Sequence, residues 1–124
     1  MDNIALVKTL YEAFGRGDIP AVLEHLDDAI EWATPLTLPQ GGHFTGKEGA
    51  LHFFQGLGAS WDPLSVDVEG IGELSDGRVV AVVQGSGQLR TGGPGAYGAA
   101  HVFTVRNHKV VRFQEFVDLD KPLG

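Results

Sequence analysis

A histidine and a glutamate near the C-terminus are the residues of this sequence best suited to acid–base chemistry. His101 and Glu115 each stand in a segment in which one set of alternate residues is apolar. Such alternation predicts strands, and two strands joined by a short loop form a hairpin. An imidazole and a carboxylate on one apolar face could exchange a proton with a ligand, or could simply satisfy each other's hydrogen bonds.

Whether these two side chains meet depends on the register of the hairpin. A two-residue loop at positions 107–108 would place Phe103 opposite Arg112, whereas a three-residue loop would place Phe103 on the same side as Phe113. Pairing of apolar side chains across strands favours the second register. We therefore expect a three-residue loop, and we predict that the histidine and the glutamate lie together on the inward face.

Aromatic residues spread along the chain could complete a ligand pocket around this pair. Large apolar side chains inside a curved sheet would bind a flat apolar molecule, because binding removes apolar surface from water. The residues that we predict to contact the ligand are Tyr11, Phe14, Trp32, His43, Phe53, Phe54, Trp61, Tyr97, Phe103 and Phe113. We expect no metal and no cofactor, because the sequence shows neither a metal-ligand spacing nor a phosphate-binding glycine motif.

Composition argues against several other classes of function. The chain has 124 residues, a formal charge of −7 and only nine lysines and arginines, so we expect no nucleic-acid partner. No apolar run approaches the ~20 residues that cross a membrane, and no signal peptide is visible. The sequence contains no cysteine, which excludes disulfides and thiolate chemistry and fits a cytoplasmic protein.

The elements that would position these residues follow from periodicity and capping signals. Helical spacing of apolar residues predicts a helix over 2–14 and a second helix capped by Asp18. Thr45 and Glu48 have the spacing of a capping box at the start of a third helix. The segments predicted to be strands are 29–34, 64–69, 79–83, 97–106 and 110–118. This order predicts one α+β domain over 1–124, with helices packed on one face of a curved sheet around a cavity.

The outward face of the predicted hairpin is also apolar. It carries Ala100, Val102 and Phe116. A face of this kind is rarely left bare in an acidic soluble protein, so we expect a homodimer that packs through the outer face of the sheet.

Three motifs stand in a specific order along the chain. They are Leu10–Asp18 (LYEAFGRGD), Gly46 followed by Phe53 and Phe54, and the C-terminal segments 101–105 and 109–118. Together they resemble the nuclear transport factor 2-like superfamily, and within it the SnoaL-like group, which contains polyketide cyclases and ketosteroid isomerase relatives. The resemblance spans nearly the whole chain. It implies a cone, in which three helices wrap a curved antiparallel (mixed) sheet around an apolar pocket, and it implies homodimers in many members.

The resemblance carries over to functional residues only in part. The base Asp of ketosteroid isomerases would stand just before Pro35, where residues 33–34 carry no carboxylate, and their oxyanion-hole Tyr would fall at Leu10. The Asp–Arg–Asp triad of limonene-epoxide hydrolases would keep only its last position, at Glu115. The late acid/base Asp of SnoaL-type cyclases matches Asp118. Alternation places Asp118 on the face away from Glu115 unless a bulge turns it, so both carboxylates are candidates.

Two kinds of function are consistent with this pattern. The first is a small cofactor-free isomerase, cyclase or hydratase, in which His101 with Glu115 or Asp118 moves a proton on an apolar carbonyl compound. The second is a protein of the same fold that binds an apolar small molecule without turnover, or serves as a dimeric scaffold. The sequence leaves open which of them applies.

Overall fold

A computed structural model describes residues 2–36 and 38–117 of the chain. The helices and strands predicted from the sequence are present there, and strand β2, which the sequence patterns left inside a loop, is added to them. The elements in chain order are α1 (Asn3–Gly15), α2 (Ile19–Glu24), β1 (Leu26–Thr34), β2 (Gly42–Thr45), α3 (Gly46–Ser60), β3 (Trp61–Glu73), β4 (Val79–Leu89), β5 (Pro94–Arg106) and β6 (Lys109–Val117).

Aspartate side chains cap the first two helices, and the sequence predicts the second of these caps, Asp18. The side chains of Asp2 and Asp18 accept hydrogen bonds from the backbone N–H groups of Ala5 and Ala21, which satisfies donors that the first turn of a helix leaves unpaired. Thr45 precedes α3, but its side chain makes no capping hydrogen bond. The expected capping box is therefore not formed, and α3 continues directly from β2.

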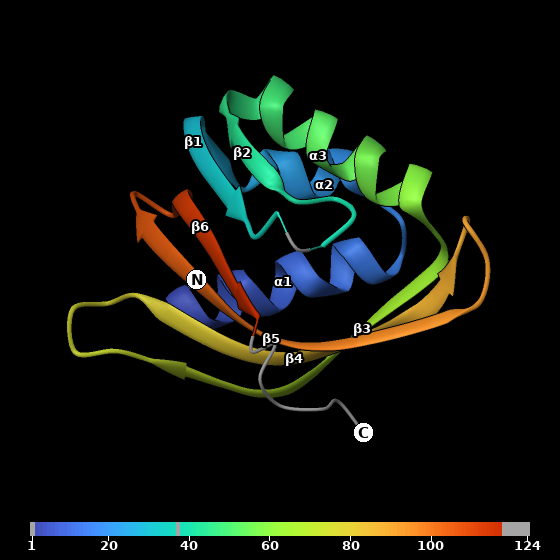
Figure 1. Ribbon diagram of the computed structural model, residues 1–124. Helices are drawn as coiled ribbons and strands as arrows, with labels where there is room; N and C mark the ends of the chain where they lie inside the picture. Colours follow the sequence, from blue (N-terminus) through green and yellow to red (C-terminus); the bar gives the residue numbers. More distant parts are fainter. Residues whose placement is uncertain (1, 37, 118–124) are drawn as a thin grey trace.

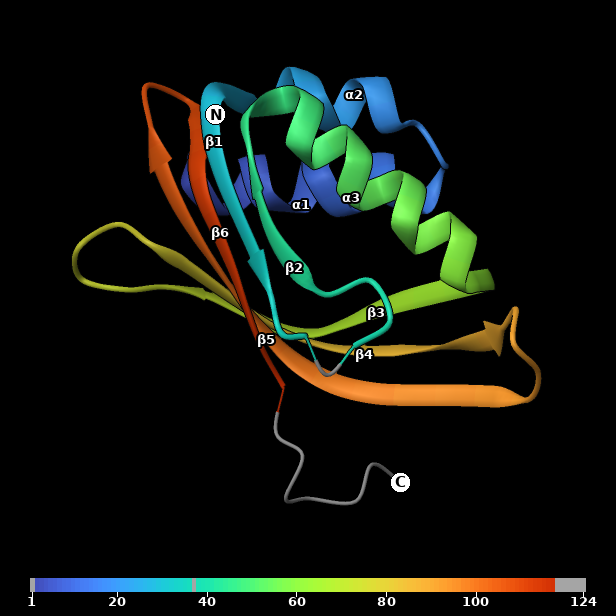
Figure 2. The ribbon, with the colours of Figure 1, turned by 45° about the horizontal axis from the view of Figure 1, so that its top comes forward.

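The strands form one curved, mixed sheet in the order β2-β1-β6-β5-β4-β3. Strands β1 and β6 are parallel, and the other neighbouring pairs are antiparallel. The sheet does not close on itself, and helices α1, α2 and α3 lie on its concave side (Figure 1 and Figure 2). This is the α+β cone predicted from the sequence, with its interior between the sheet and the helices.

The β5–β6 hairpin reaches the predicted register by an unexpected route. Its turn has two residues, Asn107 and His108, whose φ values of 52° and 62° suit a tight turn between twisted strands. A bulge at Val111 then shifts the pairing by one residue, so that Phe103 pairs with Phe113. The expected three-residue loop is wrong, whereas the predicted inward face of the hairpin is confirmed.

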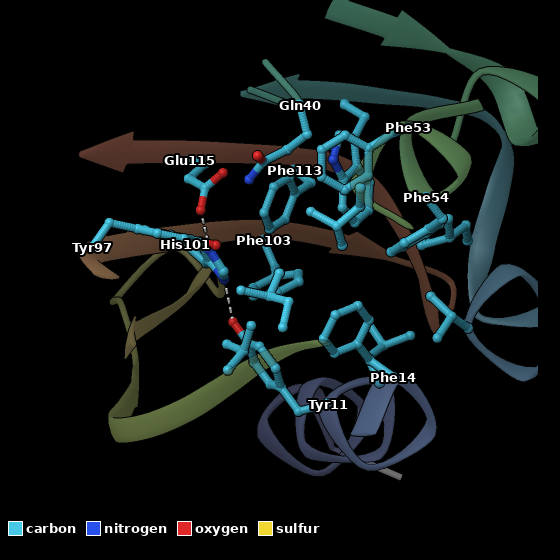
Figure 3. Close-up of a pocket in the computed structure, with 17 residues that line it drawn as sticks. Tyr11, Phe14, Gln40, Phe53, Phe54, Tyr97, His101, Phe103, Phe113 and Glu115 are labelled. Carbon is cyan, nitrogen blue, oxygen red and sulfur yellow. Dashed lines mark hydrogen bonds and ion pairs between the residues drawn. The ribbon is translucent and has the colours of Figure 1, made fainter. Parts of the chain in front are cut away.

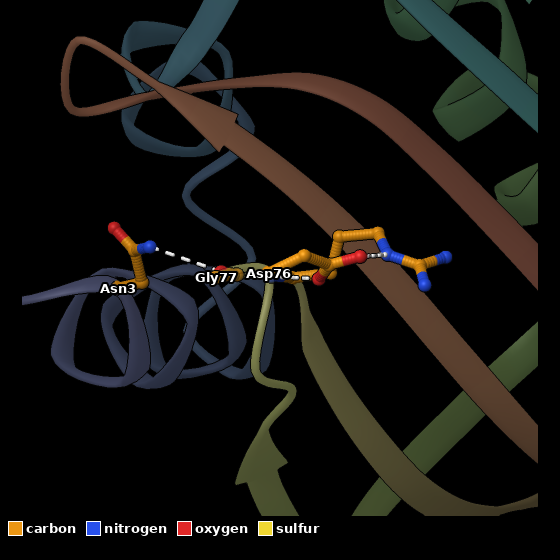
Figure 4. Close-up of polar contacts among 4 residues, drawn as sticks. Asn3, Asp76 and Gly77 are labelled. Carbon is orange, nitrogen blue, oxygen red and sulfur yellow. Dashed lines mark hydrogen bonds and ion pairs between the residues drawn. The ribbon is translucent and has the colours of Figure 1, made fainter.

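A contact at the start of α1 fixes this helix on the sheet. The Asn3 side-chain amide donates to the backbone oxygen of Gly77, in the turn between β3 and β4, over 3.0 Å (Figure 4). In the same turn Asp76 accepts hydrogen bonds from the backbone N–H and the guanidinium of Arg78, and these bonds hold the pKa of Asp76 below its usual range. The helix that carries Tyr11 is thus attached to the far edge of the sheet.

Candidate active site

An apolar pocket lies between the concave face of the sheet and the three helices. The cavity has a volume of about 70 Å³, so the pocket is narrow. Its lining residues are Leu10, Tyr11, Phe14, Val22, Leu26, Trp32, Gln40, Phe53, Phe54, Leu57, Leu64, Val66, Tyr97, His101, Phe103, Phe113 and Glu115. Most of this lining is apolar, and the few polar side chains gather at one end (Figure 3).

Three of these polar residues form a continuous hydrogen-bonded chain. His101 Nε2 lies 2.7 Å from Glu115 Oε2, and His101 Nδ1 lies 2.6 Å from the Tyr11 hydroxyl (Figure 3). The histidine and glutamate face each other directly across β5 and β6, while Tyr11 reaches them from α1, 90 residues away in the sequence. The predicted pair is therefore present, and the fold adds a third member to it.

The chemistry of donors and acceptors limits how this chain is protonated. When Glu115 is ionised it can only accept, so Nε2 of His101 carries a proton toward it. If the imidazole is neutral, Nδ1 accepts the proton of the Tyr11 hydroxyl. If the imidazole is cationic, Nδ1 donates to the tyrosine oxygen, and the hydroxyl proton becomes available to another acceptor. Proton uptake at His101 is thus coupled to the direction in which Tyr11 donates.

Both tyrosines of the pocket stay protonated near neutral pH. Burial, and then the charge of the nearby Glu115 carboxylate, raise the pKa of Tyr11 far above its usual range. The same two causes raise the pKa of Tyr97, and a hydrogen bond from the Gln40 side chain acts in the opposite direction. Tyr11 and Tyr97 therefore act as neutral hydroxyl groups, which can donate hydrogen bonds.

Aromatic rings hold the histidine in place and form the apolar wall. Phe113 stacks on Trp32 with ring centroids 4.0 Å apart, and its edge meets the His101 ring at 4.9 Å. Phe53 and Phe54 of α3 pack on the far side of Trp32 at 5.2 Å and 5.4 Å. A flat apolar ligand would complete this group of rings, since aromatic contacts of this kind add to the gain from burying surface.

A second polar group, which the sequence did not reveal, lines the same pocket as the relay, the name used below for the hydrogen-bonded chain Tyr11–His101–Glu115. Gln40, in the loop between β1 and β2, lines the pocket, and its Oε1 accepts a hydrogen bond from the indole N–H of Trp61 over 3.1 Å. No local signal identifies this glutamine, because it stands in an irregular loop rich in glycine and proline. Trp61, predicted to contact the ligand, is instead buried behind Gln40 and is not part of the pocket wall.

The structure brings together most of the residues predicted for the site. His101, Glu115, Tyr11, Phe14, Trp32, Phe53, Phe54, Tyr97, Phe103 and Phe113 all line the pocket. His43 does not, since it lies exposed on β2. Asp118 lies outside the described residues. In the described ranges, no group of three or more His, Asp or Glu side chains could hold a metal ion.

Tyr11 also borders a second hollow of the molecule. Besides lining the pocket, it borders a separate groove between α1 and β3, together with Lys8, Glu12 and residues 68–71. Its hydroxyl contacts His101. The pocket and this groove therefore share the Tyr11 side chain as part of their walls.

Fold and site together define a class of protein: an open α+β cone with a hydrogen-bonded histidine and glutamate at one end of an apolar pocket. The family model of the SnoaL-like domain matches residues 7–113, and the chain belongs to this family. No curated protein matches the sequence. None of the described helices is long and apolar enough to span a membrane.

Solved structures share this cone over almost their whole length. An NTF2-like protein from Burkholderia thailandensis is 28% identical, with a TM-score of 0.87 over 95% of this chain and 92% of that one. A proposed polyketide cyclase from Pseudomonas putida is 23% identical, with a TM-score of 0.78 over 97% and 94%. The protein Rv0760c from Mycobacterium tuberculosis, in complex with estradiol-17β-hemisuccinate, is 16% identical, with a TM-score of 0.77 over 94% and 93%. These likenesses establish the nuclear transport factor 2-like fold.

Proposed function

We propose that the chain is a cofactor-free, cytoplasmic acid–base enzyme that enolises an apolar carbonyl compound, as an isomerase or a cyclase does. The observation that carries the proposal is the buried Tyr11–His101–Glu115 chain at one end of an otherwise apolar pocket. Two similar structures support the choice of substrate class. One is a proposed polyketide cyclase, and the other holds estradiol-17β-hemisuccinate.

In the proposed step, Glu115 removes a proton from the carbon next to the carbonyl group of the ligand. His101 holds Oε2 of this carboxylate, while Oε1 has no hydrogen-bond partner among residues 2–36 and 38–117. The carbon–hydrogen bond breaks, an O–H bond forms at Oε1, and the electron pair moves to the carbonyl oxygen to give an enolate. Return of the proton to another carbon isomerises the compound.

His101 supports this step in two ways. Its N–H group stabilises the carboxylate in surroundings where an unpaired charge would be costly. Its second nitrogen lies in hydrogen-bond contact with the Tyr11 hydroxyl. The Tyr11 hydroxyl thereby holds the imidazole in the orientation in which Nε2 faces Glu115.

Deuterium exchange tests the proposal without knowledge of the natural substrate. Apolar ketones, among them 2-tetralone, are incubated with the protein in deuterated buffer, and loss of the α-proton signal is followed by NMR. Glu115→Gln keeps the shape of the side chain but removes the base, so we expect protein-dependent exchange to fall by roughly 10²–10⁴. Glu73→Gln, in an exposed position of β3, is the matched control and should exchange normally. Binding with no exchange would instead identify a binding protein.

We also propose a homodimer that packs through the outer face of the sheet. Val82, Ala100 and Phe116 form a row across β4, β5 and β6, and the outer two expose 48% and 55% of their surface. In a twofold-symmetric dimer, the same row on a second copy would pack against this one and bury both. In sedimentation we expect a dimer at micromolar concentration and a monomer for Phe116→Lys; a monomeric wild type would contradict the proposal.

A further inference from the structure

The proposed reaction needs a hydrogen-bond donor for the oxygen that becomes negatively charged. Gln40 is a polar side chain that lines the pocket and exposes only 5% of its surface. We propose, resting on the function above, that the Gln40 amide donates to the ligand carbonyl oxygen and to the enolate formed from it, and that Trp61 is the positioning residue that orients this amide.

The orientation of the Gln40 amide follows from its contact with Trp61. An indole N–H can only donate, so the amide atom 3.1 Å from it must be the oxygen. Both N–H groups of the amide then point away from Trp61. One of them acts on the Tyr97 hydroxyl, since the Gln40 amide lowers the pKa of that group. The indole N–H therefore fixes which atom of the Gln40 amide is the oxygen and which is the nitrogen.

The hydroxyl of the relay is a poorer candidate for this task. While His101 is neutral, the Tyr11 proton is directed at Nδ1 over 2.6 Å, so it is not available to a ligand. The Gln40 amide can donate without any change of protonation. Because the amide is neutral, it does not offset the negative charge of the Glu115 carboxylate before the ligand binds. A preoriented neutral donor of this kind gains most when negative charge develops beside it.

Two close approaches of the backbone hold this arrangement together. A Cβ atom added at Gly95 would lie 2.8 Å from the Trp61 ring, and one added at Gly41 would lie 1.9 Å from the backbone oxygen of Pro35. The absence of a side chain at Gly95 therefore lets the indole sit against β5, and the absence of one at Gly41 lets the loop fold tightly next to Gln40. The loop and the indole therefore hold the Gln40 amide in one orientation.

The pair of groups at this end of the pocket also defines a substrate class. Figure 3 shows Gln40 and Glu115 at the end of the pocket away from Phe14 and Phe54. A donor and a basic acceptor fit a ligand that carries a carbonyl oxygen next to an acidic carbon–hydrogen bond. An enolisable ketone has this pattern, whereas a ligand carboxylate placed at this end would be repelled by Glu115.

The test measures the bond to the ligand oxygen directly, by infrared spectroscopy of 2-tetralone labelled with ¹³C at the carbonyl. In the wild type we expect the band of the bound ketone to move to lower frequency than in an apolar solvent. Gln40→Leu and Gln40→Met have no hydrogen-bond donor; both should lose the shift and weaken binding by about 2- to 10-fold, the worth of one hydrogen bond. Gln88→Met, at an exposed position of β4, is the matched control and should retain the shift.

Trp61→Phe keeps an aromatic ring and removes the N–H group, so the Gln40 amide can rotate and exchange the positions of its oxygen and nitrogen. We expect a weakened or split carbonyl band with little change in affinity, and exchange that slows through kcat rather than KM. An unchanged carbonyl band in both Gln40 variants overturns the inference. If deuterium exchange still falls in Glu115→Gln as predicted, the proposed function remains valid in that case. If instead the band depends on Gln40 but exchange does not depend on Glu115, Gln40 is a binding contact and the proposed function fails. A wild type that does not bind 2-tetralone overturns both.

Discussion

Replacing His101 by leucine is expected to destabilise the protein more than replacing both members of its pair. The two side chains expose only 9% and 4% of their surface, and Nε2 and Oε2 are 2.7 Å apart. Leucine in place of the histidine leaves the Glu115 carboxylate without its partner in an apolar pocket, which costs about 3–5 kcal/mol of the free energy of unfolding. His101→Leu/Glu115→Leu removes the stranded charge, so we expect it to recover about 2 kcal/mol or more.

Urea denaturation followed by tryptophan fluorescence measures these differences. Trp32 and Trp61 are both buried, so their emission reports the loss of the core, and equal slopes against urea concentration would show that the unfolding reaction is the same in each variant. His43→Leu is the control, because His43 is an exposed histidine of β2 and should change stability by no more than about 0.5 kcal/mol.

Two results would refute the reasoning. A loss below about 1 kcal/mol in His101→Leu would mean that the carboxylate does not depend on the imidazole. A double variant that loses the sum of the two single variants would mean that the side chains act independently, although they lie in hydrogen-bond contact. Either outcome would also weaken the case for a proton relay.

Three further outcomes are expected. Tyr11 and Tyr97 are the only tyrosines of the chain, and burial raises the pKa of both above the usual 10.0. Phenolate absorbance should therefore stay absent until the protein unfolds in alkali. The free energy of unfolding should fall as the pH rises above 10.0, because the folded state then holds more protons than the unfolded chain. Gly85→Ala would place a Cβ atom 2.5 Å from the Tyr97 ring and should lower the free energy of unfolding, measured in urea, by about 1–3 kcal/mol. Gly56→Ala has open space inside α3 and should raise it by about 0.5–1 kcal/mol. A Gly85→Ala variant more stable than Gly56→Ala would contradict the packing of Gly85 against Tyr97. His108→Gly should raise the melting temperature, because His108 has a φ of 62° that glycine adopts without strain; a lower melting temperature would show that the imidazole contributes to the turn.

The comparison of sequence and structure is clearest in the β5–β6 hairpin. Alternation along two neighbouring strands predicted which side chains share a face, and Phe103 and Phe113 are paired as expected. The means of reaching that register was not predictable, because a two-residue turn with a bulge and a three-residue loop place the same side chains inward. Only the positions of backbone hydrogen bonds distinguish them, and these depend on the twist of the whole sheet.

Ligand-facing residues divide in the same way. Large aromatic side chains in apolar patterns were predicted to line a pocket, and most do so, because burial of such residues is decided by their own chemistry. Trp61 and His43 were assigned to the pocket on residue type, and the fold places one behind Gln40 and the other at the surface. Their direction depends on how β2 and β3 enter the sheet, which local patterns do not encode.

By itself, the sequence determined the α+β class, the cap of the second helix and the shared face of His101 and Glu115. Each of these depends on contacts between residues that are near in sequence or on neighbouring strands. The tertiary structure decided that Tyr11 meets His101 across 90 positions and that Gln40 meets Trp61. These contacts form because the sheet curves around the helices, and a curved sheet brings distant segments together in a way that no periodic pattern records.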